Sequence, residues 1–236
     1  MEKIKEKQGF QPIYENTHKF EYDITTVRSF NGRLKLVRHN ALRTKGIEDV
    51  SQHTRKGSIS DVKSENNISR AKSRVFELAL CNEWDIFLTF TLDPKKYDRD
   101  DLKKFQKDLG QFIRDYNKKY NLCIKYLLIP EEHKKGGWHL HGFLMGLPKL
   151  HLRLFTLSEK LPKYIREKLK SGQAVYEWEP YRKKFGFCDL EVVKDQFAVS
   201  AYVTKYITKD LDRTVKESGA HLYYCSQGLK RSAVVF

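Results

Sequence analysis

The 236-residue chain is 40% hydrophobic and 13% aromatic, which is enough for one sizeable folded domain or a domain with an extension. It has no run near the roughly 18 apolar residues that a membrane span needs, and its first residues, MEKIKEKQGF, lack the apolar core of a secretory signal. A net charge of +15 indicates attraction to a polyanion, and nucleic acid is the polyanion that we expect.

The N-terminal part of the chain has two short runs of alternating residues, FEYDITTV at 20–27 and RLKLV at 33–37. Asn31-Gly32 joins the two runs, and this dipeptide between alternating runs predicts a β-hairpin. The stretch 51–68 is polar and rich in turn-forming residues, so we expect a loop or linker there.

Helical and extended patterns alternate over the rest of the chain. In chain order we expect a helix over 69–82, a strand over 85–92, a helix over 100–117, strands over 123–130 and 138–146 joined by a turn, a basic helix over 159–170, a strand over 187–193 and a helix over roughly 195–210. The clearest of these is the second helix, with an apolar stripe of Leu102, Phe105, Leu109, Phe112, Ile113 and Tyr116. This order predicts an α+β fold, with a central antiparallel sheet flanked by helices.

Two histidines lie two places apart in the expected strand GGWHLHGFLMG at 136–146. Because side chains alternate between the faces of a strand, His139 and His141 share one face and Leu140 lies on the other. Two imidazoles on one face can bind a metal ion. They can equally be two polar residues on the solvated face of an edge strand.

The turn before this strand supplies a carboxylate. With a three-residue loop from Lys134 to Gly136, Glu131 lies opposite His139 and shares its face, whereas a two-residue loop brings Glu132 there instead. Two histidines and one carboxylate leave positions on a metal open for phosphate or water. The alternative for both glutamates is a solvated turn.

A pair of tyrosines occurs in YVTKYITKDLD at 202–212. On a helix, Tyr202 and Tyr206 are one turn apart on the same face, and Lys205 and Lys209 follow them by three residues each. By itself this pattern is an amphipathic helix whose lysines reach the solvent. Beside a metal-bound phosphate, an ammonium group would stabilise the phenolate of a tyrosine, whose pKa is normally about 10, and so favour its attack.

Basic and aromatic residues also alternate in YRKKFGF at 181–187. Lys and Arg can neutralise phosphates while rings stack on unpaired bases. We therefore expect Arg182, Lys183 and Lys184, together with Lys205, to hold a nucleic-acid backbone. The alternative is a solvated, soluble surface.

Other chemistries lack their motifs in this sequence. There is no Gly-x-x-x-x-Gly-Lys-Ser/Thr, so a nucleotide-driven helicase is not encoded, and there is no Gly-x-Ser-x-Gly or dinucleotide fingerprint. The four cysteines lie far apart without a Cys-x-x-Cys pair, so we expect reduced cytosolic thiols rather than disulfides or a cysteine zinc site.

Three motifs together resemble those of a known family. FLTFTLDP at 87–94, IPEEHKKGGWHLHGFL at 129–144 and YVTKYITKDLD at 202–212 are similar, in that order, to the motifs of the HUH-endonuclease replication initiators. These are the Rep proteins of rolling-circle plasmids and phages, and the likeness is greatest to those of Gram-positive bacteria. It covers roughly residues 68–231, most of the chain.

The resemblance implies a fold and a metal site. The fold is an RRM-like palm, a central antiparallel sheet in which His139 and His141 lie on an inner strand. These two histidines would bind Mg²⁺ or Mn²⁺, with Glu131 as the acidic ligand by its place in the Pro-Glu-x-His-Lys pattern.

The resemblance also implies a nucleophile. Lys-Tyr-x-x-Lys-Asp matches the family around Tyr206, so Tyr206 would attack DNA with Lys209 as its helper. Tyr202, one turn earlier, is similar to the extra tyrosine of two-tyrosine members, but many single-tyrosine members also carry an aromatic residue there.

The implied protein is a metal-dependent, site-specific nickase and strand transferase that starts rolling-circle replication through a 5′-phosphotyrosine intermediate. Its partners would be single-stranded DNA at an origin and a host polymerase and helicase, in the cytoplasm of a bacterial host and with no membrane. Residues 66–236 would be the catalytic domain and residues 1–65 a basic, strand-containing extension. A zinc-dependent hydrolase and a non-enzymatic single-stranded nucleic-acid-binding protein stay open as alternatives.

Overall fold

A computed structural model describes residues 18–30, 32–45, 61–133, 136–208, 211–212 and 220–234. The chain divides into two compact units, one of residues 1–59 with 232–236 and one of residues 60–231. Within the described ranges, every helix is too short or too polar to cross a bilayer.

The described part of the first unit is a three-stranded antiparallel sheet in the order β10–β1–β2. Its strands are β1 (His18–Phe30), β2 (Arg33–Lys45) and β10 (Ala233–Val234). Phe30 pairs with Arg33, which confirms the hairpin predicted at Asn31-Gly32. Gly32 has a φ of 74°, a left-handed conformation that glycine adopts without strain.

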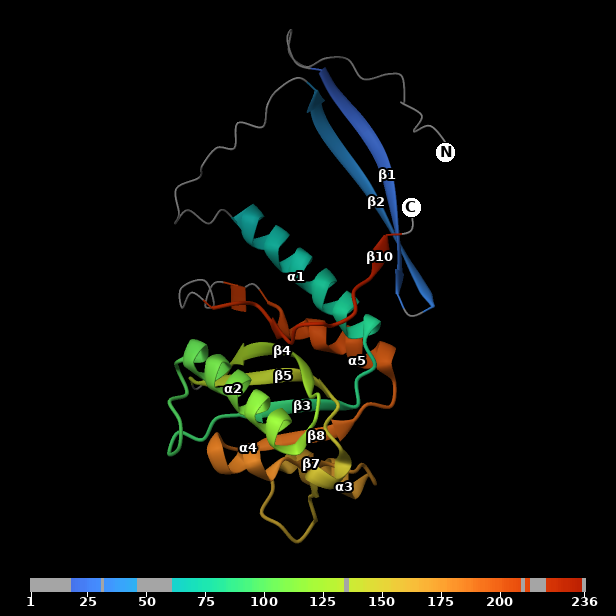
Figure 1. The fold of residues 1–236 in the computed structure, drawn as a ribbon. Helices are drawn as coiled ribbons and strands as arrows, with labels where there is room; N and C mark the ends of the chain where they lie inside the picture. The colour runs from blue at the N-terminus through green and yellow to red at the C-terminus, as the bar shows by residue number, and fades with distance from the viewer. Residues whose placement is uncertain are drawn as a thin grey trace. The chain divides into compact units, whose positions relative to one another are not determined.

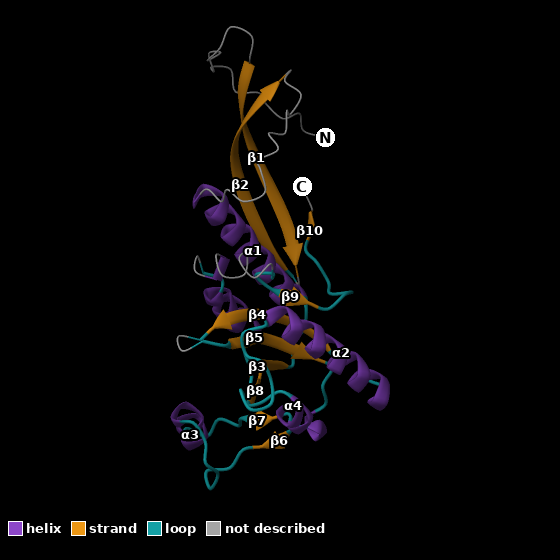
Figure 2. Cartoon of the chain, turned by 90° about the vertical axis from the view of Figure 1, so that its left-hand side faces the viewer, coloured by secondary structure: helices purple, strands orange, loops and turns teal. Residues whose placement is uncertain are grey.

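The described residues of the second unit form an α+β fold with a seven-stranded antiparallel sheet flanked by helices, which confirms the expected fold class (Figures 1 and 2). The strand order is β6–β7–β8–β3–β5–β4–β9. The strands are β3 (Ile86–Thr91), β4 (Lys125–Glu132), β5 (Trp138–Met145), β6 (Arg153–Leu154), β7 (Tyr176–Glu177), β8 (Cys188–Val192) and β9 (Tyr224–Cys225). The helices are α1 (Asp61–Cys81), α2 (Leu102–Tyr120), α3 (Lys163–Lys170), α4 (Glu179–Lys184) and α5 (Gln196–Val203), with 3-10 turns η1 (Lys149–His151) and η2 (Thr204–Tyr206).

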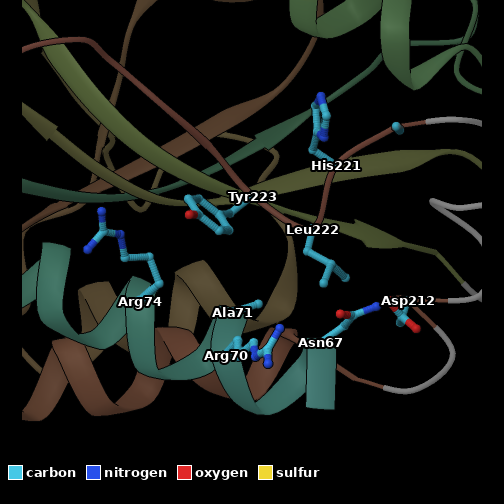
Figure 3. Close-up of a pocket in the computed structure, with 9 residues that line it drawn as sticks. Asn67, Arg70, Ala71, Arg74, Asp212, His221, Leu222 and Tyr223 are labelled. Atoms are coloured by element: carbon cyan, nitrogen blue, oxygen red, sulfur yellow. The ribbon is translucent and has the colours of Figure 1, made fainter. Parts of the chain in front are cut away.

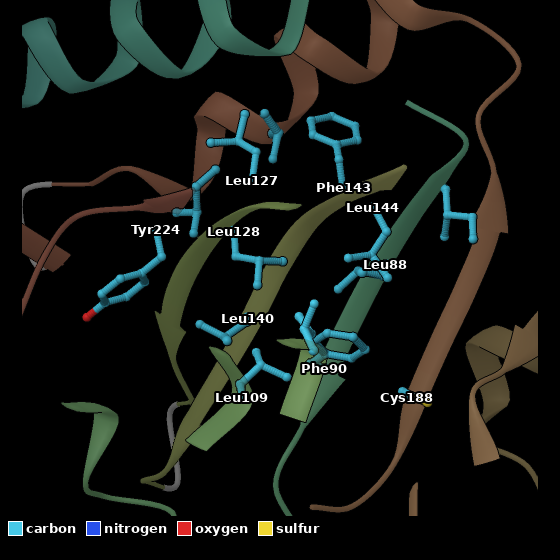
Figure 4. Close-up of a cluster of buried hydrophobic side chains, with 14 of the residues drawn as sticks. Leu88, Phe90, Leu109, Leu127, Leu128, Leu140, Phe143, Leu144, Cys188 and Tyr224 are labelled. Carbon is cyan, nitrogen blue, oxygen red and sulfur yellow. The ribbon is translucent and has the colours of Figure 1, made fainter. Parts of the chain in front are cut away.

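Helices cover both faces of the central strands. Leu128, Leu140 and Phe90 point to the face under α2, whereas Leu127 and Phe143 point to the face under α1 and α5 (Figures 1 and 4). Because each strand is buried on both faces, its sequence is a nearly continuous apolar run instead of a strict alternation.

Helix α2 forms where the apolar stripe predicted it. The side chain of Asp101 accepts a hydrogen bond from the backbone N–H of Lys104 at 2.9 Å and caps the start. Asn121, with a φ of 52°, ends the helix in the left-handed conformation. The buried residues of the helix are Leu102, Phe105, Leu109, Gly110, Ile113 and Tyr116.

Two local predictions were wrong. The loop expected over 51–68 is helical from Asp61, because the first two turns, DVKSENN, contain one apolar residue and so show no helical periodicity. The segment YRKKFGF is not an open basic strip, because its first four residues form the end of α4.

We expect Gly142→Ala to destabilise the protein by about 3 kcal/mol or more. A Cβ at position 142 would overlap the carbonyl oxygen of Leu127 on the neighbouring strand, where the backbone has no room to move. Thermal or chemical unfolding measures the loss. Gly172→Ala is the control, since position 172 has a φ of 80° but open space around it, and should cost about 1 kcal/mol. Equal losses in the two variants would contradict this account of the sheet.

Candidate active site

Neighbouring strands place a set of polar side chains on one face of the sheet. In the pairing, Thr89 of β3 lies between His141 of β5 and Asp189 of β8. The adjacent row consists of Thr91, His139 and Glu131. These rows form the floor of a cavity of about 320 Å³, whose walls include Phe87, His133, Tyr164, Lys168, Glu191, Tyr202 and Tyr206.

The register of the β4–β5 hairpin decides which glutamate shares this face. Glu131 pairs with His139 and Glu132 pairs with Trp138, the register of the three-residue loop. The carboxylate Oε2 of Glu131 lies 2.6 Å from Nε2 of His141. This hydrogen bond, with the positive potential of the histidines and Lys205, lowers the pKa of Glu131 against the opposing effect of burial.

Two threonines of β3 orient the two imidazoles. Thr91 Oγ1 lies 3.0 Å from Nδ1 of His139, and Thr89 Oγ1 lies 3.3 Å from Nδ1 of His141. The tautomer that donates Nδ1–H to each threonine leaves both Nε2 lone pairs directed at the cavity. The threonines therefore act as the supporting partners that metal-binding histidines ordinarily have.

The Nε2 atom of His139 is buried and has no hydrogen-bond partner among the described residues. Burial, and then the neighbouring His141 and His133, lower the pKa of His139 to about 4. The imidazole is therefore neutral near neutral pH and keeps a lone pair available. An unsatisfied buried nitrogen costs about 1–3 kcal/mol, and a ligand at this position would remove that cost.

The donor set of two imidazole nitrogens and one carboxylate fits a divalent cation. As they stand, the described residues hold no group of three His, Cys, Asp or Glu side chains at metal-binding distance. The reason is local, because Glu131 and His141 form a hydrogen bond to each other. A cation bound by these residues would have to open that bond and displace its proton.

The helix that carries the tyrosines is shorter than expected. Asp195 caps its start by accepting hydrogen bonds from Phe197 and Ala198, but α5 ends at Val203 instead of continuing to residue 210. A 3-10 turn follows, in which the Ile207 N–H donates to the Thr204 carbonyl at 3.2 Å. The β-branched residues of VTKYIT disfavour a continued α-helix, which explains the tighter turn.

Tyr202 and Tyr206 nevertheless lie side by side at the cavity. The Tyr206 hydroxyl donates to the Tyr202 hydroxyl at 3.4 Å. The Tyr206 ring stacks on His141, with centroids 4.0 Å apart and an angle of 5° between the planes. Burial, and then the hydrogen bond and negative potential of its neighbours, raise the pKa of Tyr206 well above the ordinary value.

Lys205 lies against both rings, with its Nζ 3.6 Å from the Tyr202 centroid and 4.8 Å from the Tyr206 centroid. Burial acts to raise the pKa of Tyr202, but the hydrogen bonds from Lys205 and Tyr206 and the positive charge of Lys205 outweigh it and lower the pKa. Tyr202 is therefore the more acidic phenol, while Tyr206 is the one in contact with a candidate metal ligand. Lys209, the expected helper, lies outside the described residues.

Residues 85–211 match the family model for replication-associated protein ORF2. The match covers more than half of the chain and contains the whole candidate site. The chain belongs to this family. No curated protein and no solved structure shows significant similarity to it.

Sequence reasoning missed one wall of the cavity in this replication-associated protein. Asp189 is 3% exposed and accepts a hydrogen bond from the Tyr164 hydroxyl at 2.9 Å, and its burial raises its pKa. Lys168 donates to Glu191 at 2.7 Å beside it. The alternation in FCDLEVV does put Asp189 and Glu191 on one face, but the contact with α3 links distant parts of the chain and leaves no local pattern.

The three basic residues expected at DNA do not line this cavity. The Arg182 guanidinium donates to Glu177, which is 1% exposed, and Lys183 lies 3.8 Å from Glu179. The ammonium of Lys184 lies over the rings of Phe112 and Phe185. Among the aromatic residues of the segment, Tyr181 and Phe185 are fully buried in the core, so the expectation that these two rings stack on bases is wrong.

We expect the metal-free protein to lose stability as the pH falls from about 6.5 to about 4. In this window the unfolded chain protonates the imidazole at position 139, whereas the folded protein does not, because the pKa of His139 is lowered on folding. Discounted for the partial exposure of the ring, the loss is about 1–2 kcal/mol.

Urea unfolding in EDTA at several pH values measures this dependence. His139→Asn should make stability less dependent on pH in the same window, whereas His221→Asn, at an exposed position, should leave the dependence unchanged. Identical pH profiles for wild type and His139→Asn would contradict the buried, neutral imidazole.

Proposed function

We propose that the chain is a metal-dependent nickase and strand transferase that acts on single-stranded DNA at a replication origin. The observation that carries the proposal is the meeting in one cavity of Glu131, His139 and His141 with Tyr206, whose ring stacks on His141. A nucleophile in contact with a cation ligand can reach a phosphate held by the same cation. Membership of a replication-associated family supports a substrate that is DNA.

The residues fit a cation such as Mg²⁺ or Mn²⁺, which Glu131, His139 and His141 would hold. Bound there, a divalent cation would polarise the scissile phosphate and offset the charge that develops on it. The same donors would also suit a catalytic zinc, as in a zinc-dependent hydrolase. The paired tyrosines beside Lys205 favour phosphoryl transfer to the protein over hydrolysis, because a hydrolase has no use for them.

The proposed step exchanges one phosphodiester for another. The Tyr206 oxygen forms a bond to phosphorus while the bond between phosphorus and O3′ breaks. The tyrosine loses its proton, the departing O3′ gains one, and the 5′-phosphate stays on the protein. The new ester conserves the bond energy, so rejoining needs no nucleotide cofactor, and the free 3′-hydroxyl can prime a host polymerase working with a host helicase.

The proton of Tyr206 has a path out of the site. The Tyr206 hydroxyl donates to Tyr202, whose pKa Lys205 helps to lower, so the Tyr202 oxygen is in position to accept that proton. A second tyrosine so close could also attack the first covalent link and resolve it. The proposal therefore includes Tyr206 as first nucleophile, Tyr202 as its partner and Lys205, with Lys209, as stabilising cations.

The wider setting is part of the proposal and rests on the sequence motifs. We infer a rolling-circle initiator of a plasmid or phage of Gram-positive bacteria, acting in the cytoplasm of its host. The strongly basic chain would bind the DNA backbone over several phosphates.

We expect Glu131→Gln to weaken Mn²⁺ binding by more than the roughly 10–100-fold loss that outer partners of metal ligands cause, and to abolish nicking. The amide keeps the size of the side chain but removes the negative charge that the cation needs. Isothermal titration with Mn²⁺ and a nicking assay on denaturing gels measure the two effects. Glu132→Gln is the matched control, because Glu132 is adjacent in sequence but pairs with Trp138 and does not line the cavity. Loss of activity in Glu132→Gln alone would mean that the proposed ligand is wrong.

We expect Tyr206→Phe to remove the major covalent adduct with single-stranded origin DNA, because it deletes the attacking oxygen and keeps the ring on His141. Tyr202→Phe should still nick at a reduced rate but fail at the second transfer. Mass spectrometry of adduct peptides identifies the linked residue. Adduct mapped to Tyr202 in the Tyr206→Phe protein at wild-type yield would reverse the roles, and loss only in the double variant would make the two tyrosines interchangeable.

A further inference from the structure

A second cavity, of about 610 Å³, lies between α1 and the segment that leads into β9 (Figure 3). Arg70 and Arg74 line it from α1, one helical turn apart, while His221 and Tyr223 line it from the other side. This cavity and the catalytic cavity have no described lining residue in common.

The lining of this cavity is basic. Neither Arg70 nor Arg74 forms a hydrogen bond or ion pair within the described part of the chain, so both guanidinium groups keep their donors available. Asp212 brings a carboxylate to the lining, but it is 2% exposed and so offers little to a ligand. Burial raises the pKa of the Cys225 thiol, and the positive charges of Arg231 and Arg74 both oppose that rise, which indicates a third arginine close by.

The cavity also has an aromatic side chain and a link to the catalytic site. The Tyr223 side chain lies beside α1, near Arg74 (Figure 3). Helix α1 itself packs against α5 and η2, the segments that carry Tyr202 and Tyr206. A strand held against α1 would therefore be held by the same layer of helices that carries the tyrosines.

Two guanidinium groups one turn apart suit two oxygens of phosphate esters, and a tyrosine ring suits the face of an unpaired base. We propose that this cavity is a second contact site for single-stranded DNA, in which Arg70 and Arg74 bind backbone phosphates and Tyr223 stacks on a base. The inference rests on the proposed function for its substrate and adds a binding site outside the catalytic cavity. A free nucleotide offers the same chemistry, so the test has to separate the two sources.

The experiment measures the affinity of the full chain for a fluorescent single-stranded oligonucleotide of mixed sequence, in EDTA, over a series of salt concentrations. Because Arg70→Ala/Arg74→Ala removes two cations that would each bind a phosphate, we expect the slope of log K against log salt to fall by about 1.4 and the affinity at 0.1 M salt to fall about 25-fold. Alanine is the best helix former, so the helix should persist, and circular dichroism checks it.

The matched control is Arg114→Ala/Lys118→Ala. This pair removes two positive charges at the same spacing from exposed positions of α2, the helix on the opposite face of the sheet. It should bind DNA within about twofold of wild type. An equal loss in both double variants would mean that overall charge, and not this cavity, holds the strand, and would overturn the proposal.

Three further outcomes decide the rest. If the α1 variant keeps wild-type affinity and salt slope while the wild type nicks origin DNA, the site is wrong and the proposed function stands. If the wild type neither binds nor nicks DNA, both fall. Thymidine 5′-monophosphate or inorganic phosphate that binds wild type, but not the α1 variant, without competing with the oligonucleotide would assign the cavity to a free phosphate ester and overturn the DNA strand as its occupant.

Discussion

The pairing of Glu131 with His139 across the β4–β5 hairpin is the constraint on which the rest of the candidate site depends. A slip of one residue would turn every side chain of a strand to the other face. Pro130 would then face the histidines, and Glu131 would be driven toward the apolar layer under α2. The core prevents this slip, because Leu128 and Leu140 are buried against that layer and Gly142 fits only where the Leu127 carbonyl approaches closely.

The polar face of the sheet carries a cost that the rest of the fold has to offset. Asp189 is nearly buried, the Nε2 atom of His139 has no described partner, and Tyr206 lies partly buried against an imidazole. Each feature destabilises a protein unless a ligand or partner compensates it. The apolar layers on both sides of the sheet provide the stability, so the binding of a cation and an anionic strand would relieve strain already present in the free protein.

The sequence predicted well what depends on local patterns. High β-propensity located the four central strands, the stripe of α2 marked the helix over the sheet, and loop length predicted the hairpin register. The ends of α1 and α5 were mispredicted for opposite reasons, since DVKSENN has too few apolar residues to mark a helix and VTKYIT has too many β-branched residues to continue one. Tyr181 and Phe185 were mistaken for base-stacking rings although their spacing of four residues fits one buried helix face. Asp189 and Tyr164 meet only through a contact between α3 and β8, which no pattern along the chain reveals.

The central claim is that the protein becomes linked to DNA through a phosphoryl group. The most direct measurement uses two versions of one single-stranded origin oligonucleotide, one labelled upstream of the cleavage point and one labelled downstream. Each is incubated with the protein and Mn²⁺ and then boiled in SDS before electrophoresis. The account predicts that the downstream label migrates with the protein and the upstream label is released as a strand ending in a 3′-hydroxyl. Release of both labels as free DNA would contradict the account in favour of a hydrolase, and two intact strands would leave a protein that only binds.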